Sequence, residues 1–165
     1  MRKRILVIDD VPDWQAQLRA ILRQEYDVTT VGSYDAAMQI ITRREVELAI
    51  VDLRLDPANE ENLEGMELLK ALAQQRINAI VLTGYPEDQL QEEAEETYNV
   101  FDFIDKSSLA SNFQRIKDIV GEAFRLLESK EKAKAQAIRA ASALQSVAFT
   151  DDLASWPLRK ARKDK

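Results

Sequence analysis

The chain has 165 residues, of which 45% are hydrophobic, and its formal net charge at pH 7 is -6. This length supports one substantial hydrophobic core with an appendage rather than two complete domains. The acidic balance disfavours nucleic acid or an anionic membrane as the main partner. The chain contains neither cysteine nor histidine, which excludes disulfides, thiolate metal sites and Ser/His/Asp catalysis. Any chemistry must therefore use carboxylates, lysine, threonine or a bound metal ion.

No apolar run approaches the roughly 20 residues needed to cross a bilayer. The first apolar run stops at Asp9 and Asp10, which is too early for the core of a signal peptide. Together with the absence of cysteine, these features predict a soluble protein of the cytoplasm with no membrane partner.

Short apolar, β-branched runs alternate with helical patterns along the first two thirds of the chain. Helical patterns begin near Pro12, Tyr34, Gly65 and Glu87. The runs between them predict strands at 4–9, 26–31, 47–52, 78–83 and 100–104. This order predicts an α/β fold with a five-stranded parallel sheet, doubly wound, in which sites form beyond the carboxyl ends of the strands.

Polar side chains follow four of these predicted strands. Their order along the chain is Asp9 and Asp10, then Asp52, Thr83 and Lys106. Three clustered carboxylates repel one another unless a cation joins them, and Mg²⁺ prefers such hard oxygen ligands. The Lys106 ammonium and the Thr83 hydroxyl complete a set that suits a tetrahedral dianion beside a carboxylate nucleophile. This set predicts formation of an aspartyl phosphate.

Each of these residues also has a plainer explanation. The acidic pair can cap the following helix, Thr83 can end a strand through its β propensity, and Lys106 can be a solvated surface residue. Their joint placement at successive strand ends favours the functional interpretation.

The chain from residue 3 to about residue 127 resembles a bacterial response-regulator receiver domain of the CheY-like superfamily. The matching segments are 5–10, 26–30, 48–53, 65–69, 80–84 and 103–106. The resemblance implies a flavodoxin-like (β/α)5 fold in which Asp52 accepts a phosphoryl group from a histidine kinase or phosphotransfer protein. It also implies that Asp9, Asp10, Asp52 and the main-chain carbonyl of Arg54 hold Mg²⁺.

The same resemblance implies a conformational switch. Lys106 would pair with the phosphoryl group, Thr83 would move to bond it, and Phe103 would turn inward behind Thr83, changing the surface that a downstream effector protein reads. Arg54 and Tyr85 lie at positions that tune access of the hydrolytic water in this family. Two departures are the unusually long loop at 54–64 and Ser107, where the family commonly has proline after the lysine.

The segment 109–147 contains no proline and predicts a helix of roughly 60 Å, at about 1.5 Å per residue. Small and apolar residues recur there in alternating steps of four and three, the spacing of a coiled-coil seam. This seam comprises Ile119, Ala123, Leu126, Lys130, Ala133, Ala137, Ala140, Leu144 and Val147. We expect it to form a homodimer, although an alanine-rich helix folding back on its own domain stays open.

These patterns predict a receiver domain at 1–128, a helical extension and possible coiled coil at 129–149, and a flexible basic tail at 150–165. The leading hypothesis is a phosphorylation-controlled switch that lacks its own DNA-binding domain and is not a turnover enzyme. The alternative is a receiver-like interaction and dimerisation module that no longer uses phosphorylation. A phosphatase of the haloacid dehalogenase type would need a second aspartate two positions after Asp9, where Val11 stands.

Overall fold

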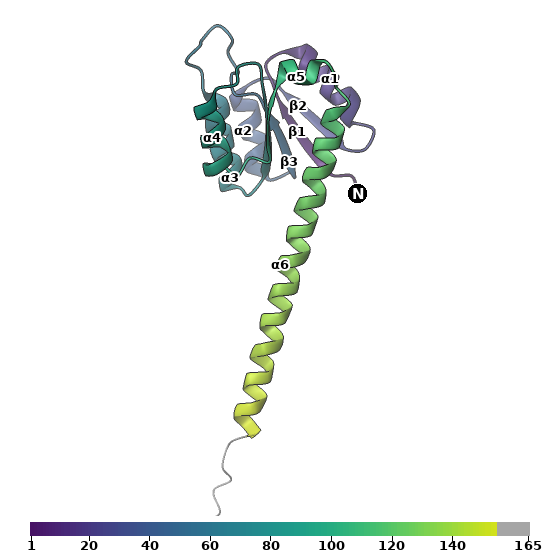
Figure 1. Cartoon of the computed structure of the whole chain (residues 1–165), viewed down its shortest axis with the longest axis vertical. Helices are drawn as coiled ribbons and strands as arrows, with labels where there is room; N and C mark the ends of the chain where they lie inside the picture. The colour runs from purple at the N-terminus through teal and green to yellow at the C-terminus, as the bar shows by residue number, and fades with distance from the viewer. Residues whose placement is uncertain (155–165) are drawn as a thin grey trace, which may run out of the picture. The chain divides into compact units, whose positions relative to one another are not determined.

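A computed structural model describes the backbone of residues 1–154 and the side chains of residues 1–147 (Figure 1). The chain divides into two compact units, Met1–Gly121 and Glu122–Lys165. The first unit contains one parallel sheet with the strand order β2-β1-β3-β4-β5. Its strands are β1 (Arg4–Ile8), β2 (Asp27–Val31), β3 (Leu48–Val51), β4 (Asn78–Thr83) and β5 (Asp102–Asp105). The predicted five-stranded parallel α/β fold is thereby confirmed.

The fifth strand begins two residues later than predicted. The Val100 amide donates to the Ala94 carbonyl at 3.2 Å, so it belongs to the turn that ends the preceding helix. The Phe101 amide then donates to the carbonyl of Ala79 at 2.8 Å, which leads the chain into β5. The apolar character of Val100 reflects burial beneath this turn and not a place in the strand.

Helices follow each strand and cover both faces of the sheet. They are α1 (Pro12–Leu22), α2 (Tyr34–Arg43), α3 (Glu64–Gln74), α4 (Asp88–Thr97), α5 (Lys106–Ala110) and α6 (Arg115–Ala154). Figure 1 shows α2, α3 and α4 on one side of the sheet and α1 and α5 on the other. A sheet covered on both faces explains why its strands read as continuous apolar runs rather than alternating ones.

The core under α2, α3 and α4 is built from alternate strand residues, because successive side chains of a strand point to opposite faces. Its helical contributions include Ile41 of α2, Leu69 of α3 and Ala94 of α4. The strand residues of this cluster are Leu6, Ile8, Ala49, Val51, Ala79 and Val81. Since both faces are packed, every strand is fixed in register and its carboxyl end is placed accurately.

The chain after β5 differs from the single long helix predicted from residue 109, and that prediction was wrong. Asp105 accepts hydrogen bonds at 2.8 Å from both the amide and the hydroxyl of Ser107, so a helix already starts at Lys106. These two bonds lower the pKa of the exposed Asp105 carboxyl. Short turn bonds, from Asn112 to Leu109 and from Arg115 to Asn112, then separate α5 from α6.

The long helix α6 begins at Arg115 and continues to Ala154, past the predicted end at residue 149. The remainder of the predicted basic tail, 155–165, lies outside the described residues. Within the described backbone all peptide bonds are trans, including the one that joins Lys106 to Ser107. Among the helices of the described residues, none has the length and apolar character required to span a membrane.

The long loop between β3 and α3 is held by its own polar groups. The Asn62 side chain accepts hydrogen bonds at 3.3 Å from the amides of Leu55 and Glu64, and Leu55 is buried. The Gly65 amide donates to the Leu53 carbonyl at 3.1 Å, which brings the first turn of α3 against the chain leaving β3. A Cβ atom on Gly65 would lie 2.7 Å from the Leu53 carbonyl oxygen and still closer to other backbone atoms of residues 52 and 53.

We therefore predict that Gly65→Ala lowers the free energy of unfolding by about 1 to 3 kcal/mol, because backbone must move to admit one methyl group. The matched control is Gly121→Ala in α6, where the new Cβ would meet only the Tyr26 hydroxyl at 4.0 Å. That change should raise the free energy by up to about 1 kcal/mol through helix propensity. Urea denaturation followed by circular dichroism measures both, and equal stability of the two variants would contradict the prediction.

Candidate functional site

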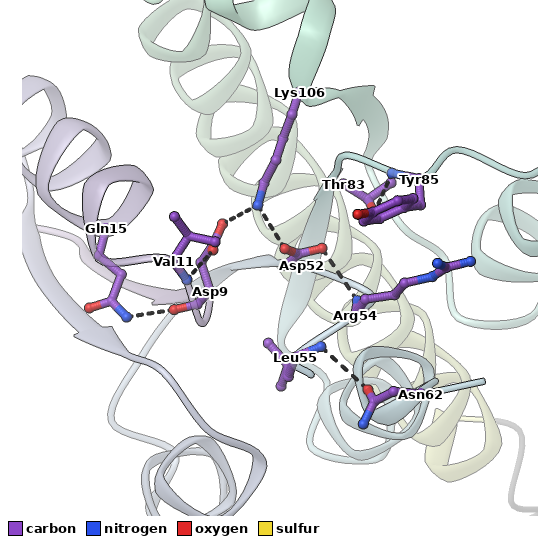
Figure 2. A network of polar contacts seen from close by, with 10 residues as sticks. All are labelled: Asp9, Val11, Gln15, Asp52, Arg54, Leu55, Asn62, Thr83, Tyr85 and Lys106. Carbon is purple, nitrogen blue, oxygen red and sulfur yellow. Dashed lines mark hydrogen bonds and ion pairs between the residues drawn. The ribbon is translucent and has the colours of Figure 1, made fainter. Parts of the chain in front are cut away.

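The sheet brings the predicted site residues together at the carboxyl ends of its strands (Figure 2). The Asp52 amide donates to the Ile8 carbonyl at 2.9 Å, which continues the pairing of β3 with β1 up to the site. The buried polar residues of the described part of the chain are Asp9, Asp52, Thr83 and Lys106. Only 8% of Lys106 is exposed, so the plainer explanation of it as a solvated surface lysine is wrong.

Lys106 connects the two buried carboxylates. Its Nζ lies 2.7 Å from Oδ2 of Asp9 and 2.7 Å from Oδ2 of Asp52. Burial by itself would lower the pKa of Lys106, but hydrogen bonds to Asp52 and Asp9 outweigh it and raise that pKa. Burial raises the pKa of Asp9, and this effect exceeds the opposing influence of Lys106.

Asp10 completes a cluster of three carboxylates. One oxygen each from Asp9, Asp10 and Asp52 can lie within 4.8 Å of the others. The pKa of Asp10 is raised, mainly by desolvation and in addition by the charge of Asp52. A carboxyl whose pKa is raised on folding contributes stability at low pH that is lost as pH rises through the folded pKa. A divalent cation among these oxygens would offset that loss.

This donor set fits Mg²⁺, which takes hard oxygen ligands and retains several waters. The cluster offers carboxylates from two strand ends, and Asp10 is half-buried, so water can still reach it. The role of the Arg54 carbonyl as a further ligand stays a prediction. What the structure gives for Arg54 is a hydrogen bond from its amide to Oδ1 of Asp52 at 3.3 Å.

The capping explanation for the acidic pair fails in its simple form. The residue that caps α1 is Val11, and no side chain caps this helix. Asp9 does accept a hydrogen bond from the Val11 amide at 2.9 Å, but through Oδ1, while its Oδ2 faces Lys106. One oxygen of Asp9 therefore stabilises the turn after β1, while its other oxygen belongs to the charged cluster.

Thr83 and Phe103 lie next to the site in adjacent strands. Thr83 is fully buried, and its hydroxyl accepts a hydrogen bond from the Tyr85 amide at 3.2 Å. Phe103 is half-buried, is paired with Val81 in the sheet and packs against the core cluster. The switching role predicted for both residues stays a prediction.

Arg54 links the loop after β3 to the start of α4. Its guanidinium lies 4.3 Å from the centre of the Tyr85 ring and pairs with Glu87 at 3.0 Å. Glu87 is the residue that precedes α4, and sequence reasoning did not single it out. This contact joins positions 33 residues apart, and no local pattern in the sequence signals it.

Two residues of α1 also support the site and were missed. The Trp14 ring centre is 5.1 Å from Nζ of Lys106 and 5.1 Å from the Phe113 ring centre. The Gln15 amide group donates a hydrogen bond to the main-chain oxygen of Asp9. The sequence places Trp14 on the packing face of its helix. Its contact with the Lys106 ammonium could not be predicted, because Lys106 lies far away in the sequence, after β5. Trp14 therefore contacts the lysine of the cluster, and Gln15 binds the backbone of one of its aspartates.

The parallel sheet with a charged cluster of three aspartates, one lysine and one threonine defines a receiver domain. Residues 5–119 match the family model of the response regulator receiver domain, and the chain belongs to this family. The hydrogenase transcriptional regulatory protein HoxA of Cupriavidus necator is 33% identical over 87 residues, which are 52% of this chain. The chain spans 17% of the length of this curated relative.

Solved structures share the fold at lower identity. A CheY-like receiver domain protein from Methanospirillum hungatei is 23% identical with a TM-score of 0.56, covering 74% of this chain and 99% of that one. TrrA from Thermotoga maritima, in complex with Mg²⁺ and BeF, is 23% identical with a TM-score of 0.56, covering 73% and 97%. A fusion carrying the yeast Spc42 trimeric coiled coil is 21% identical with a TM-score of 0.68, covering 91% and 97%.

We predict that Mg²⁺ stabilises the protein and that Asp10→Asn removes most of this effect. A free Mg²⁺ concentration about ten times Kd should add about 1.4 kcal/mol by mass action. Without metal, Asp10→Asn should be at least as stable as the wild type, because a like charge beside Asp52 is gone. Thermal unfolding with and without Mg²⁺ measures both effects.

The control for this experiment is Asp35→Asn, which removes an exposed carboxylate from the first turn of α2. It should keep the full response to Mg²⁺ while losing a little stability at the helix N-terminus. An equal response to Mg²⁺ in the wild type and Asp10→Asn would contradict the assignment of the metal site.

Proposed function

We propose that the chain is a phosphorylation-controlled switch in which Asp52 accepts a phosphoryl group from the phosphohistidine of a kinase or phosphotransfer protein. An Asp52 carboxylate oxygen attacks phosphorus, the P–N bond breaks, and its electron pair returns to the departing imidazole. The observation that carries the proposal is the Lys106 ammonium, 2.7 Å from Asp52, which can neutralise phosphoryl charge as it arrives. The proposed place of action is the cytoplasm.

Asp9, Asp10 and Asp52, with the carbonyl of Arg54, would hold Mg²⁺, which supplies positive charge to the phosphoryl oxygens. The Thr83 hydroxyl, now accepting from the Tyr85 amide, would turn to donate to a phosphoryl oxygen. Phe103, on the neighbouring strand, would then move behind Thr83. These movements would change the surface formed by α4, β5 and the long helix that follows β5, which is α6 in this structure, and we propose this surface as the binding site of a downstream effector protein.

We predict that a small phosphodonor such as acetyl phosphate, with Mg²⁺, adds the mass of one phosphoryl group to the protein. Asp52→Asn should abolish this gain because it removes the nucleophile. Asp56→Asn is the matched control, since Asp56 is an exposed acid in the same loop and should leave the gain unchanged. Intact-mass spectrometry reads the result directly. No gain in the wild type, or a gain that survives Asp52→Asn, would favour the alternative of a module that works without phosphorylation.

We further propose that α6 joins two copies of the chain. Three large residues of the predicted seam are exposed in the single chain: Leu126 at 45%, Leu144 at 71% and Val147 at 57%. Because these residues share one stripe of the helix, a second helix packed along that stripe would bury all three together. The fusion carrying a trimeric coiled coil supports helical assembly, because its similarity covers 91% of this chain. We propose a homodimer as the oligomeric state. We do not propose nucleic acid as a partner.

The seam can be tested with matched lysine substitutions. We predict that the wild type has twice the monomer mass in light scattering, and that Leu126→Lys combined with Leu144→Lys yields a monomer. Ile138→Lys is the control, because Ile138 is 58% exposed yet lies off the seam, and this variant should stay dimeric. A monomeric or trimeric wild type, or equal effects of the seam and control changes, would contradict the proposed dimer.

A further inference from the structure

A cationic pocket lies at the end of the sheet opposite to the aspartate cluster. Its volume is about 650 Å³, and it includes the amino ends of β1 and β2. The side chains that define it, which we call the arginine pocket, are Arg2, Arg4, Arg19, Arg23, Arg43 and Tyr26. They come from β1 and the residues before it, from α1 and its C-cap, from α2, and from the segment entering β2, so the fold brings together residues that are far apart in the sequence.

The charge of the arginine pocket runs against that of the whole chain. Its lining holds five arginines but two acids, Asp27 and Glu45, whereas the net charge of the chain is -6. A surplus of positive charge in a hollow concentrates anions from solution. The pocket is therefore a positively charged region on an otherwise acidic protein.

Three of these arginines have no anionic partner within the described part of the chain. Arg4 pairs with Glu47 at 3.6 Å, and Arg2 donates to the main-chain oxygen of Arg23 at 3.1 Å. No carboxylate of a described residue lies within 4.0 Å of the guanidinium groups of Arg19, Arg23 and Arg43.

These three arginines stand at the carboxyl ends of helices. Arg19 lies in the last turn of α1 and Arg23 caps it, so each cation interacts favourably with the helix dipole while the two like charges, four positions apart, repel one another. Arg43, at the end of α2, adds a third unpaired cation to the same pocket. An anion bound among them would turn this repulsion into attraction.

A plainer explanation is that charged residues protect the edge of the sheet, since β2 is an edge strand. Edge protection needs charges along the strand, of either sign. It does not require unpaired cations from two helices around one hollow of this size. The clustering and the shared sign therefore favour ligand binding.

The geometry points to a small, phosphate-rich anion of about the size of a nucleoside triphosphate as the occupant of the arginine pocket. Arginine forks bind phosphate oxygens in pairs, which a lysine ammonium cannot do. The volume falls within the usual range of small-molecule sites, about 300 to 1,000 Å³. The half-buried Tyr26 offers an aromatic ring at the wall for a base to contact.

The test is calorimetric titration of the full chain with ATP, inorganic triphosphate and AMP, in EDTA so that the metal site stays empty. ATP should bind, AMP should bind more weakly, and Asp52→Asn should bind ATP as the wild type does. Arg19→Ala combined with Arg23→Ala and Arg43→Ala should weaken binding at least about tenfold. The corresponding lysine substitutions keep the charge and the fold but lose the paired hydrogen bonds. The ATP affinity of that variant should therefore lie between those of the wild type and the alanine variant.

Arg139→Ala, which removes an exposed arginine of α6 outside the pocket, should leave binding unchanged. If triphosphate binds as tightly as ATP, the phosphate chain alone is recognised. If ATP binds more tightly and Tyr26→Ala removes the difference, the base is recognised as well. No binding of any probe at about 1 mM, where even a weak site is detected, would overturn the inference. Equal weakening by Arg139→Ala, or preference for a DNA duplex over ATP, would overturn it too.

Discussion

One ammonium group between two buried carboxylates is the interaction on which this molecule depends. Lys106 Nζ is 2.7 Å from both Asp9 and Asp52, and burying an unpaired charge at either position would be strongly unfavourable. With Asp10 ionised as well, three acids face one cation, which leaves two negative charges uncompensated. That deficit equals the charge of one Mg²⁺ ion. The metal-free cluster thus holds together while remaining electrostatically prepared for a divalent cation.

The position of Lys106 is in turn fixed by local chemistry. The Asp105 side chain caps α5 through Ser107, so Lys106 becomes the first residue of a helix instead of the last of a strand. Its ammonium then passes Trp14, which packs on Phe113 in the turn before α6. The charged site therefore contacts an aromatic pair, Trp14 and Phe113, that lies just before α6. A change in the orientation of Lys106 would alter its contact with the Trp14 ring, which in turn packs on Phe113.

The sequence predicted the site better than it predicted the helices. Asp9, Asp52 and Thr83 could be placed because buried strands are marked by apolar runs, and parallel strands end at one edge. The break at 111–114 was missed because apolar periodicity continues across it, while the turn bonds and the Phe113 packing found there depend on contacts that the sequence pattern does not show. The Arg54 pair with Glu87 was missed for the same reason: it depends on two loops meeting in space.

In the receiver unit, the cluster of Asp9, Asp10 and Asp52 lies at the carboxyl ends of the strands, and the arginine pocket lies at the amino ends of β1 and β2. β1 joins the two ends through five residues, which at about 3.3 Å per residue span roughly 17 Å. The Debye length at physiological ionic strength is about 8 Å, but it describes screening between exposed charges, and Asp52 is buried. A phosphoryl group on Asp52 and an anion in the arginine pocket would therefore repel one another weakly through the packed core of the sheet. Because that core resists small continuous deformation, any stronger coupling between the two sites would require a second discrete arrangement of the sheet and its helices.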